Sequence, residues 1–159
     1  MKINVFMMIL LASLMIISCN KSSNETNVVV KSEIVLSKSG EDYAAAYTNR
    51  SPAISSPFDL KDISVKDGNV ELTVAYSGGC KKHNFEIIWD DKIDSGNPAV
   101  INLIVIHHDN DDTCEANIKE NLKFTVSDLL DNIVIKEYSV DVSSGYTPDD
   151  SIVYSGNPD

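Results

Sequence analysis

The chain is poor in basic residues, and this shortage excludes two kinds of partner. It has 13 lysines and arginines against 24 aspartates and glutamates in 159 residues, a formal net charge of −11 at pH 7. Proteins bind nucleic acid or anionic lipid surfaces largely by neutralising phosphates with lysine and arginine. We therefore expect no nucleic-acid partner, and the length favours a single domain.

The motifs of several large enzyme classes are also missing. The sequence has no Gly-x-Ser-x-Gly nucleophile elbow, no phosphate-binding loop and no dinucleotide-binding fingerprint. Its acidic residues are too numerous to single out a pair of glycosidase carboxylates. The sequence therefore predicts a protein that is not an enzyme.

Methionine is absent after residue 18, because the first segment has a composition of its own. Residues 1–18 hold all four methionines and 14 hydrophobic residues. Lys2 followed by an apolar run to Ile17 is typical of a secretory signal peptide and is short for a membrane span. Its removal leaves 159 − 18 = 141 residues with a net charge of −11 − 1 = −12. Without methionine, the mature chain has no copper site of the methionine type.

The end of the signal peptide, Ile16-Ile17-Ser18-Cys19, resembles the bacterial lipobox, in which the cysteine is acylated and becomes the new N-terminus. The resemblance implies that Cys19 carries acyl chains such as palmitate, which anchor a protein to a bilayer because each buried methylene contributes about 0.8 kcal/mol. Asn20 in place of aspartate favours the outer membrane. The alternative is an ordinary signal peptide with an incidental cysteine. We expect residues 19–32 to be the lipidated N-terminus and a flexible linker, since they begin as a polar tract.

Residues 33–159 have the pattern of short β-strands. Apolar residues alternate in 70–76 and in 85–89, as in half-buried strands, and 99–106 is almost wholly apolar, as in a central strand covered on both faces. The pattern predicts an all-β domain, a β-sandwich of immunoglobulin-like type, with a small β-barrel as the alternative. Further strands are expected at 34–36, 63–66, 114–119, 122–126, 133–142 with a bulge near 136–137, and 152–154, with a weak edge strand at 43–47 and a helical turn at 127–130.

Three cysteines leave one pair once Cys19 is assigned to lipid. Cys80 and Cys114 then remain as an even number of cysteines in an oxidising compartment. This predicts a disulfide between them. Their separation of 114 − 80 = 34 positions corresponds to a stabilisation of about 3.8 kcal/mol in the chain-entropy model. The alternative use of this pair is as zinc thiolates.

All three histidines of the chain lie close to these two cysteines in the sequence. Alternate residues of a strand lie on one face, so His83 shares a face with the apolar residues of 85–89, and His107 shares a face with those of 101–105. Both imidazoles should therefore point inward at strand ends. The segment 108–113 is short enough for a hairpin connection, which would bring His107 near Cys114.

Two interpretations of this end of the domain stay open. In the first, His83 and His107 supply nitrogen ligands and Asp109 an oxygen ligand to a divalent metal, zinc or copper. In the second, the histidines are satisfied by hydrogen bonds and brace the disulfide, with no cofactor.

The stretch Gly78-Gly79-Cys80-x-x-His83-x-Phe85, followed by His107 and then Asp112-x-Cys114-Glu115-Ala116, resembles a pattern of small uncharacterised lipoproteins of Bacteroidota. The resemblance covers residues 76–116 and implies a secreted β-domain, with no catalytic residue carried over.

The sequence therefore predicts a lipoprotein of the cell envelope, anchored to the bilayer through Cys19, that acts as a binding or interaction module. An envelope protein or a glycan would be its partner, and a periplasmic metal-binding protein using His83 and His107 is the alternative. Four tyrosines in loop-like or terminal positions are candidates for partner contact: Tyr43, Tyr47, Tyr146 and Tyr154.

Overall fold

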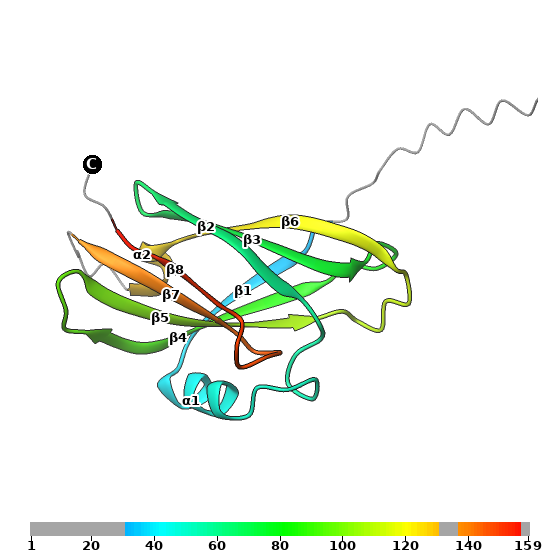
Figure 1. The fold of residues 1–159 in the computed structure, drawn as a ribbon, viewed down its shortest axis with the longest axis horizontal. Helices are drawn as coiled ribbons and strands as arrows, with labels where there is room; N and C mark the ends of the chain where they lie inside the picture. The colour runs from blue at the N-terminus through cyan, green and yellow to red at the C-terminus, as the bar shows by residue number, and fades with distance from the viewer. Residues whose placement is uncertain (1–30, 131–136, 157–159) are drawn as a thin grey trace, which may run out of the picture.

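The structure is a computed structural model that describes residues 31–130 and 137–156. Eight strands and two short helices form a sandwich of two sheets (Figure 1). The strands are β1 (Glu33–Lys38), β2 (Asp59–Lys66), β3 (Asn69–Gly78), β4 (Asn84–Asp94), β5 (Ala99–His108), β6 (Ala116–Thr125), β7 (Tyr138–Ser144) and β8 (Ser151–Tyr154). The helices are α1 (Gly40–Thr48) and α2 (Val126–Leu130).

One sheet has five strands in the order β1-β4-β5-β7-β8, and the other has three in the order β2-β3-β6. Within the described residues the two sheets share no strand pairing, so the all-β sandwich prediction is confirmed and the barrel alternative is not observed. The five-stranded sheet is mixed, because β1 pairs with β4 and β5 with β7 in parallel. Alternation of apolar residues carries no information on strand direction, so these parallel pairs were not predicted.

The core lies between the sheets and uses the alternate residues that the sequence indicated. Val70, Leu72 and Val74 of β3 face Phe85, Ile87 and Trp89 of β4, and all are at most 4% exposed. Strand β5 is buried on both faces, as predicted for 99–106. Its odd residues enter the main core, while Ile104 and Ile106 join a second, smaller cluster under α1.

The expected edge strand at 43–47 is wrong, because this segment forms helix α1. Ser39 caps the helix by accepting a hydrogen bond from the Asp42 N–H, and Glu41 and Asp42 stand in the first turn. Three consecutive alanines, Ala44 to Ala46, then favour the helix over a strand. The helix covers the outer face of β4 and β5 (Figure 1).

Three other expectations differ in detail. The separate strands expected at 114–119 and 122–126 form one continuous strand, β6, whose every residue pairs with β3. The segment 108–113 is not part of a hairpin, since it leads from β5 in one sheet to β6 in the other. Residues 133–136 of the expected strand 133–142, with most of its bulge, lie outside the described residues, and β7 begins at Tyr138. The helical turn expected at 127–130 is present in α2, where Thr125 accepts from the Asp128 N–H.

Candidate functional site

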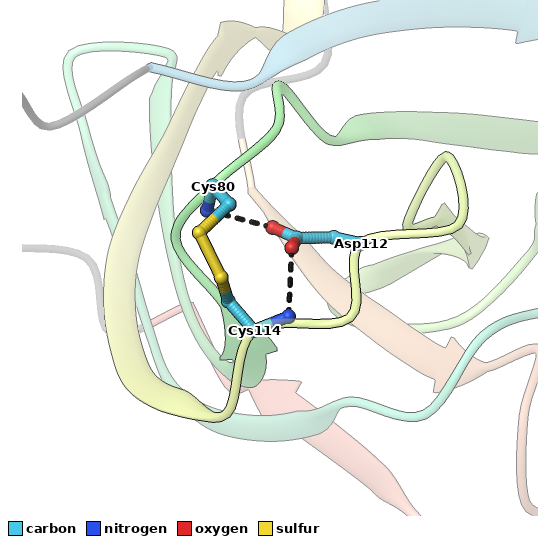
Figure 2. Close-up of side chains that lie close together, drawn as sticks. All are labelled: Cys80, Asp112 and Cys114. Carbon is cyan, nitrogen blue, oxygen red and sulfur yellow. Dashed lines mark hydrogen bonds between the residues drawn. A yellow bond between two sulfur atoms is a disulfide. The ribbon is translucent and has the colours of Figure 1, made fainter.

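Two connections between the sheets meet at one end of the sandwich. The first, 79–83, leads from β3 to β4, and the second, 109–115, leads from β5 to β6. A disulfide between Cys80 and Cys114 joins them, with a Cα–Cα distance of 5.9 Å (Figure 2). We call residues 78–83 together with 107–114 the disulfide corner. The predicted cysteine pair and both predicted inward histidines lie in it.

Local backbone geometry explains several residues of the corner. Gly79 has a φ of 114°, a conformation that glycine adopts readily. Asn110 and Asp111 have φ values of 56° and 55°, in the left-handed region that asparagine and aspartate tolerate better than most residues. Gly78 leaves room for the His83 ring, because a Cβ atom there would lie 2.6 Å from its Cε1.

His83 and His107 are each 1% exposed and bind one another. The His83 Nδ1 lies 2.8 Å from the His107 Nε2, and the rings stack with centroids 5.0 Å apart. The outer nitrogens are also engaged: the His107 Nδ1 with the Pro57 carbonyl at 3.2 Å, and the His83 Nε2 with Asp112 Oδ2 at 3.2 Å. All four ring nitrogens therefore have partners.

The direction of these bonds follows from what each partner can do. The Pro57 carbonyl can only accept, so the His107 Nδ1 carries the proton, and the Nε2 of a neutral His107 accepts. The His83 Nδ1 must then donate to it. Because Asp112 is a carboxylate that only accepts, the His83 Nε2 also donates. The His83 ring is thus linked on one side to His107 and on the other to an Asp112 side chain that is itself 0% exposed.

The two shifted pKa values in this group agree with that assignment. Burial, and next the electrostatic interaction with His83, lower the pKa of His107 from 6.5 to about 4, which keeps His107 neutral at pH 7. Hydrogen bonds from backbone N–H groups, foremost those of Cys114 and Lys81, hold the pKa of Asp112 well below its ordinary value.

Asp112 is the central acceptor of the corner. Its Oδ2 accepts from the N–H groups of Gly79, Cys80 and Lys81, each at 2.9 Å, and its Oδ1 accepts from the Cys114 N–H at 2.9 Å. Figure 2 shows the carboxylate lying between the two connections, beside the disulfide. Asp112 was not predicted as a site residue. Its signal in the sequence is an aspartate two positions before a cysteine, a spacing at which the carboxylate can accept the cysteine N–H.

A second, partly buried group extends from the histidines to the start of the described chain. The Tyr76 ring lies 4.6 Å from the His83 ring between centroids, and its hydroxyl donates to Glu120 Oε2 at 2.7 Å. The same oxygen accepts from the Ser32 hydroxyl at 2.7 Å, and Glu120 Oε1 accepts from the Ser32 N–H at 3.0 Å. Ser32, which the sequence placed in the flexible linker, is therefore buried and bound to β6. A lone glutamate on a strand gave no signal for this role.

Of the three residues predicted as metal ligands, His83 and His107 lie together, but Asp109 does not form a ligand group with them. Asp109 accepts from the Asp111 N–H within its own loop, whereas Asp112 takes the place beside His83. Over the described ranges, the group of potential ligands whose donor atoms all lie within 4.8 Å is Cys80, Asp112 and Cys114. The histidine geometry is that of hydrogen bonding, because no ring nitrogen is left over for a metal.

Two other predictions concern regions away from the corner. Cys19 lies outside the described residues. Within the part of the chain that the structure describes, no helix is both long and apolar enough to span a bilayer.

Comparisons with known proteins identify distant structural neighbours. No family model matches the chain, and no curated protein sequence matches it. Among solved structures, a protein of unknown function from Bacteroides vulgatus has a TM-score of 0.48 and 12% identity over 80% of this chain and 57% of its own. A NigD-like immunity protein from Bacteroides caccae has a TM-score of 0.47 and 17% identity over 77% of this chain and 59% of its own. A Bacteroides fragilis protein described as a lipoprotein has a TM-score of 0.40 and 9% identity over 79% of this chain and 68% of its own.

The chain thus spans less than three fifths of the length of the first two of these proteins. The identities and scores are too low to transfer a function to this chain.

Proposed function

We propose that the chain is a binding module of the cell envelope, held on the outer membrane by acyl chains on Cys19, and that its partner is an envelope protein. The lipobox-like end of the signal peptide supports the anchor, and the resemblance to Bacteroidota lipoproteins agrees with it. The observation that carries the proposal is that the buried histidines and carboxylates bind one another and the backbone. Within the described residues no buried side-chain nitrogen or oxygen lacks a partner.

Side chains whose polar atoms are engaged in internal hydrogen bonds hold the two sheets together, and they do not present a reactive centre to solvent. The parts of the molecule available to a partner are therefore on its surface. The predicted alternative of metal binding by His83, His107 and Asp109 would require breaking the bonds between the rings, so the hydrogen-bonded interpretation is the better supported of the two.

A contact surface around α1 fits this function. The Tyr47 side chain is 42% exposed, stacks on Tyr43 with ring centroids 5.6 Å apart, and has the Arg50 guanidinium 3.8 Å from its ring centroid. Burial mainly raises the pKa of Tyr43 to about 12, and the charges of Asp90, Tyr47 and Asp141 add to it. Asp141 of β7 pairs with Val153 of β8, which is 52% exposed. We define the Tyr47 surface as Tyr43, Tyr47, Arg50, Asp141 and Val153.

Two features of the Tyr47 surface suit a protein partner. Tyrosine and arginine side chains are enriched in protein interfaces. Arg50 covers one face of the Tyr47 ring, which leaves less of the ring for stacking against a sugar. The other two candidate tyrosines, Tyr146 and Tyr154, pack against the main core and are not part of this surface.

Photo-cross-linking in cells tests the proposal. A photoreactive amino acid is placed at position 47 or 153 of the full chain, with position 35 as the matched control, since Val35 is 49% exposed on the opposite edge strand of the same sheet. We expect one defined protein adduct from 47 and 153 and none from 35. Adducts that are absent, or equal at all three positions, would contradict a specific surface, and retention of the chain by isolated envelope polysaccharide would favour the glycan instead.

The anchor is tested separately by feeding labelled palmitate to cells. Label should enter the wild-type chain and not the Cys19→Ser variant. Label in both, or in neither, would refute acylation of Cys19.

A further inference from the structure

The disulfide corner contains three side chains whose donor atoms are of kinds that bind metal ions. Donor atoms of Cys80, Asp112 and Cys114 lie within 4.8 Å of one another, and these are two sulfurs and a carboxylate oxygen. While the disulfide is intact its sulfurs are not thiolates, and thiolates are the form that binds metal. We propose that reduction of the Cys80–Cys114 disulfide converts the corner into a binding site for one zinc ion, held by both thiolates and Asp112.

The first support is that hydrogen bonds hold the two connections together without help from the disulfide. Asp112 binds three consecutive N–H groups of the first connection, those of 79–81. In return, the Lys81 ammonium donates to the carbonyls of Asn110 and Asp111 at 2.8 Å each, and the Asn110 amide donates to the Lys82 carbonyl at 2.6 Å. These six hydrogen bonds, together with the one between His83 Nε2 and Asp112 Oδ2, join the two segments, so both sulfurs should stay adjacent after their bond is broken.

The second support is access. Cys80 is exposed and Cys114 is partly exposed, so a reductant can reach the sulfurs and a metal ion can enter from solvent. The histidine pair behind them is buried, which confines the change to the surface side of the corner.

The third support is the chemistry of the donors. Zinc in proteins prefers cysteine sulfur, histidine nitrogen and carboxylate oxygen, and three protein ligands leave one tetrahedral position for water. Asp112 Oδ1 accepts one hydrogen bond, from Cys114, and so keeps a lone pair for a metal. Its Oδ2 is held by the backbone and by His83, the outer hydrogen bonding that commonly orients a metal-bound carboxylate.

The proposed change has two steps, reduction of the disulfide and then binding of zinc. A dithiol, free or carried by a protein, gives two electrons and two protons to the Cys80 and Cys114 sulfurs and is itself oxidised to a disulfide. The S–S bond breaks and two thiols form. Zinc then replaces the two thiol protons, which pass to solvent, so binding should strengthen as pH rises.

The test is a titration of the full chain, purified in detergent, with Zn²⁺ alone. One sample is oxidised and the other is reduced with a phosphine, which does not compete for zinc as a dithiol would. We expect the reduced chain to bind one zinc ion and the oxidised chain to bind none. Cobalt substituted for zinc should give the charge-transfer absorption of two thiolate ligands.

Three variants make the test specific. The double variant Cys80→Ser/Cys114→Ser should lose binding, and Asp112→Asn should weaken it by about tenfold or more. Asp109→Asn is the matched control, a carboxylate in the same connection that lies outside the ligand group, and it should bind as the wild type does. Circular dichroism of each sample checks the fold.

Several outcomes would overturn the proposal: no zinc bound by the reduced chain, binding that survives the double cysteine substitution, or equal binding by the oxidised chain. Unfolding on reduction would also overturn it, because the hydrogen bonds are required to keep the sulfurs adjacent. None of these results affects the proposed binding function of the Tyr47 surface, which lies elsewhere.

Discussion

Lowering the pH from 7 to 4 should destabilise the fold through His107 by about 3 kcal/mol. The pKa of His107 falls from 6.5 in the unfolded chain to about 4 in the folded one, first because the ring is buried and next because of its electrostatic interaction with His83. An unfolded chain therefore takes up a proton on this residue between pH 6.5 and 4, while the folded chain does not. Stability is fully present above pH 6.5 and is lost as the pH falls towards 4.

The magnitude follows from the shift of about 2.5 pKa units at about 1.4 kcal/mol per unit, reduced slightly because the folded protein is half-protonated at pH 4. A loss of this size is a substantial part of the 5–15 kcal/mol that stabilises a typical domain. Carboxyl groups of an unfolded chain also titrate near pH 4, so a variant is needed to isolate the histidine.

Urea unfolding at several pH values measures this effect. His107→Gln should remove the His107 part of the slope between pH 6.5 and 4, and His108→Gln, which changes the exposed neighbouring histidine, is the matched control. Because the chain has three histidines, NMR titration of their ring protons can follow each one directly. A His107 ring that titrates near pH 6.5, or an unchanged slope in His107→Gln, would refute the reasoning.

Three further substitutions test contacts beside the buried histidines and in the core. Gly78→Ala places a Cβ atom 2.7 Å from the His83 Nε2 and should cost about 1–3 kcal/mol in urea unfolding, and an unchanged midpoint would mean that the ring is free to move. Tyr76→Phe removes the hydroxyl that donates to Glu120 and should lower stability by about 1–2 kcal/mol; a melting temperature equal to that of the wild type would show that this bond adds nothing. Leu122→Ala in β6, where the side chain is 0% exposed, should cost about 2–5 kcal/mol, and a loss under 1 kcal/mol would contradict its place in the core.

The fold class could be predicted from the sequence because alternation of apolar residues reports directly on which side of a strand is buried. The inward positions of His83 and His107 followed from the same parity, since each continues the apolar face of its neighbouring strand. A helix at 40–48 was missed for a physical reason: its cap and its three alanines are local signals, but its buried side is narrow, with Ala46 as its buried residue.

The alternation of residues along a strand predicts which face a side chain lies on, but not which residue it contacts. This explains the main error at the site, which is the prediction of Asp109 as a ligand. Asp109 and Asp112 lie in one short acidic segment, and nothing in their spacing says which carboxylate turns back to the histidines. The path of 109–115 from one sheet to the other decides it, because this path carries Asp112 to the N–H groups of the first connection. The hairpin expected for this segment would have placed β5 and β6 in a single sheet.

By itself, the sequence determined an all-β sandwich, the buried faces of its main strands and the inward direction of two histidines, because these depend on local periodicity. Its prediction of an acylated Cys19 depends on a motif and is tested by labelling. Only the tertiary structure decided that Ser32, Tyr76 and Glu120 form a partly buried group, and that Asp112 lies between the two cysteines. Asp112 lies 32 positions from Cys80, and Ser32 lies 88 positions from Glu120. Contacts over such distances depend on which strands pair and on where the chain crosses between the sheets.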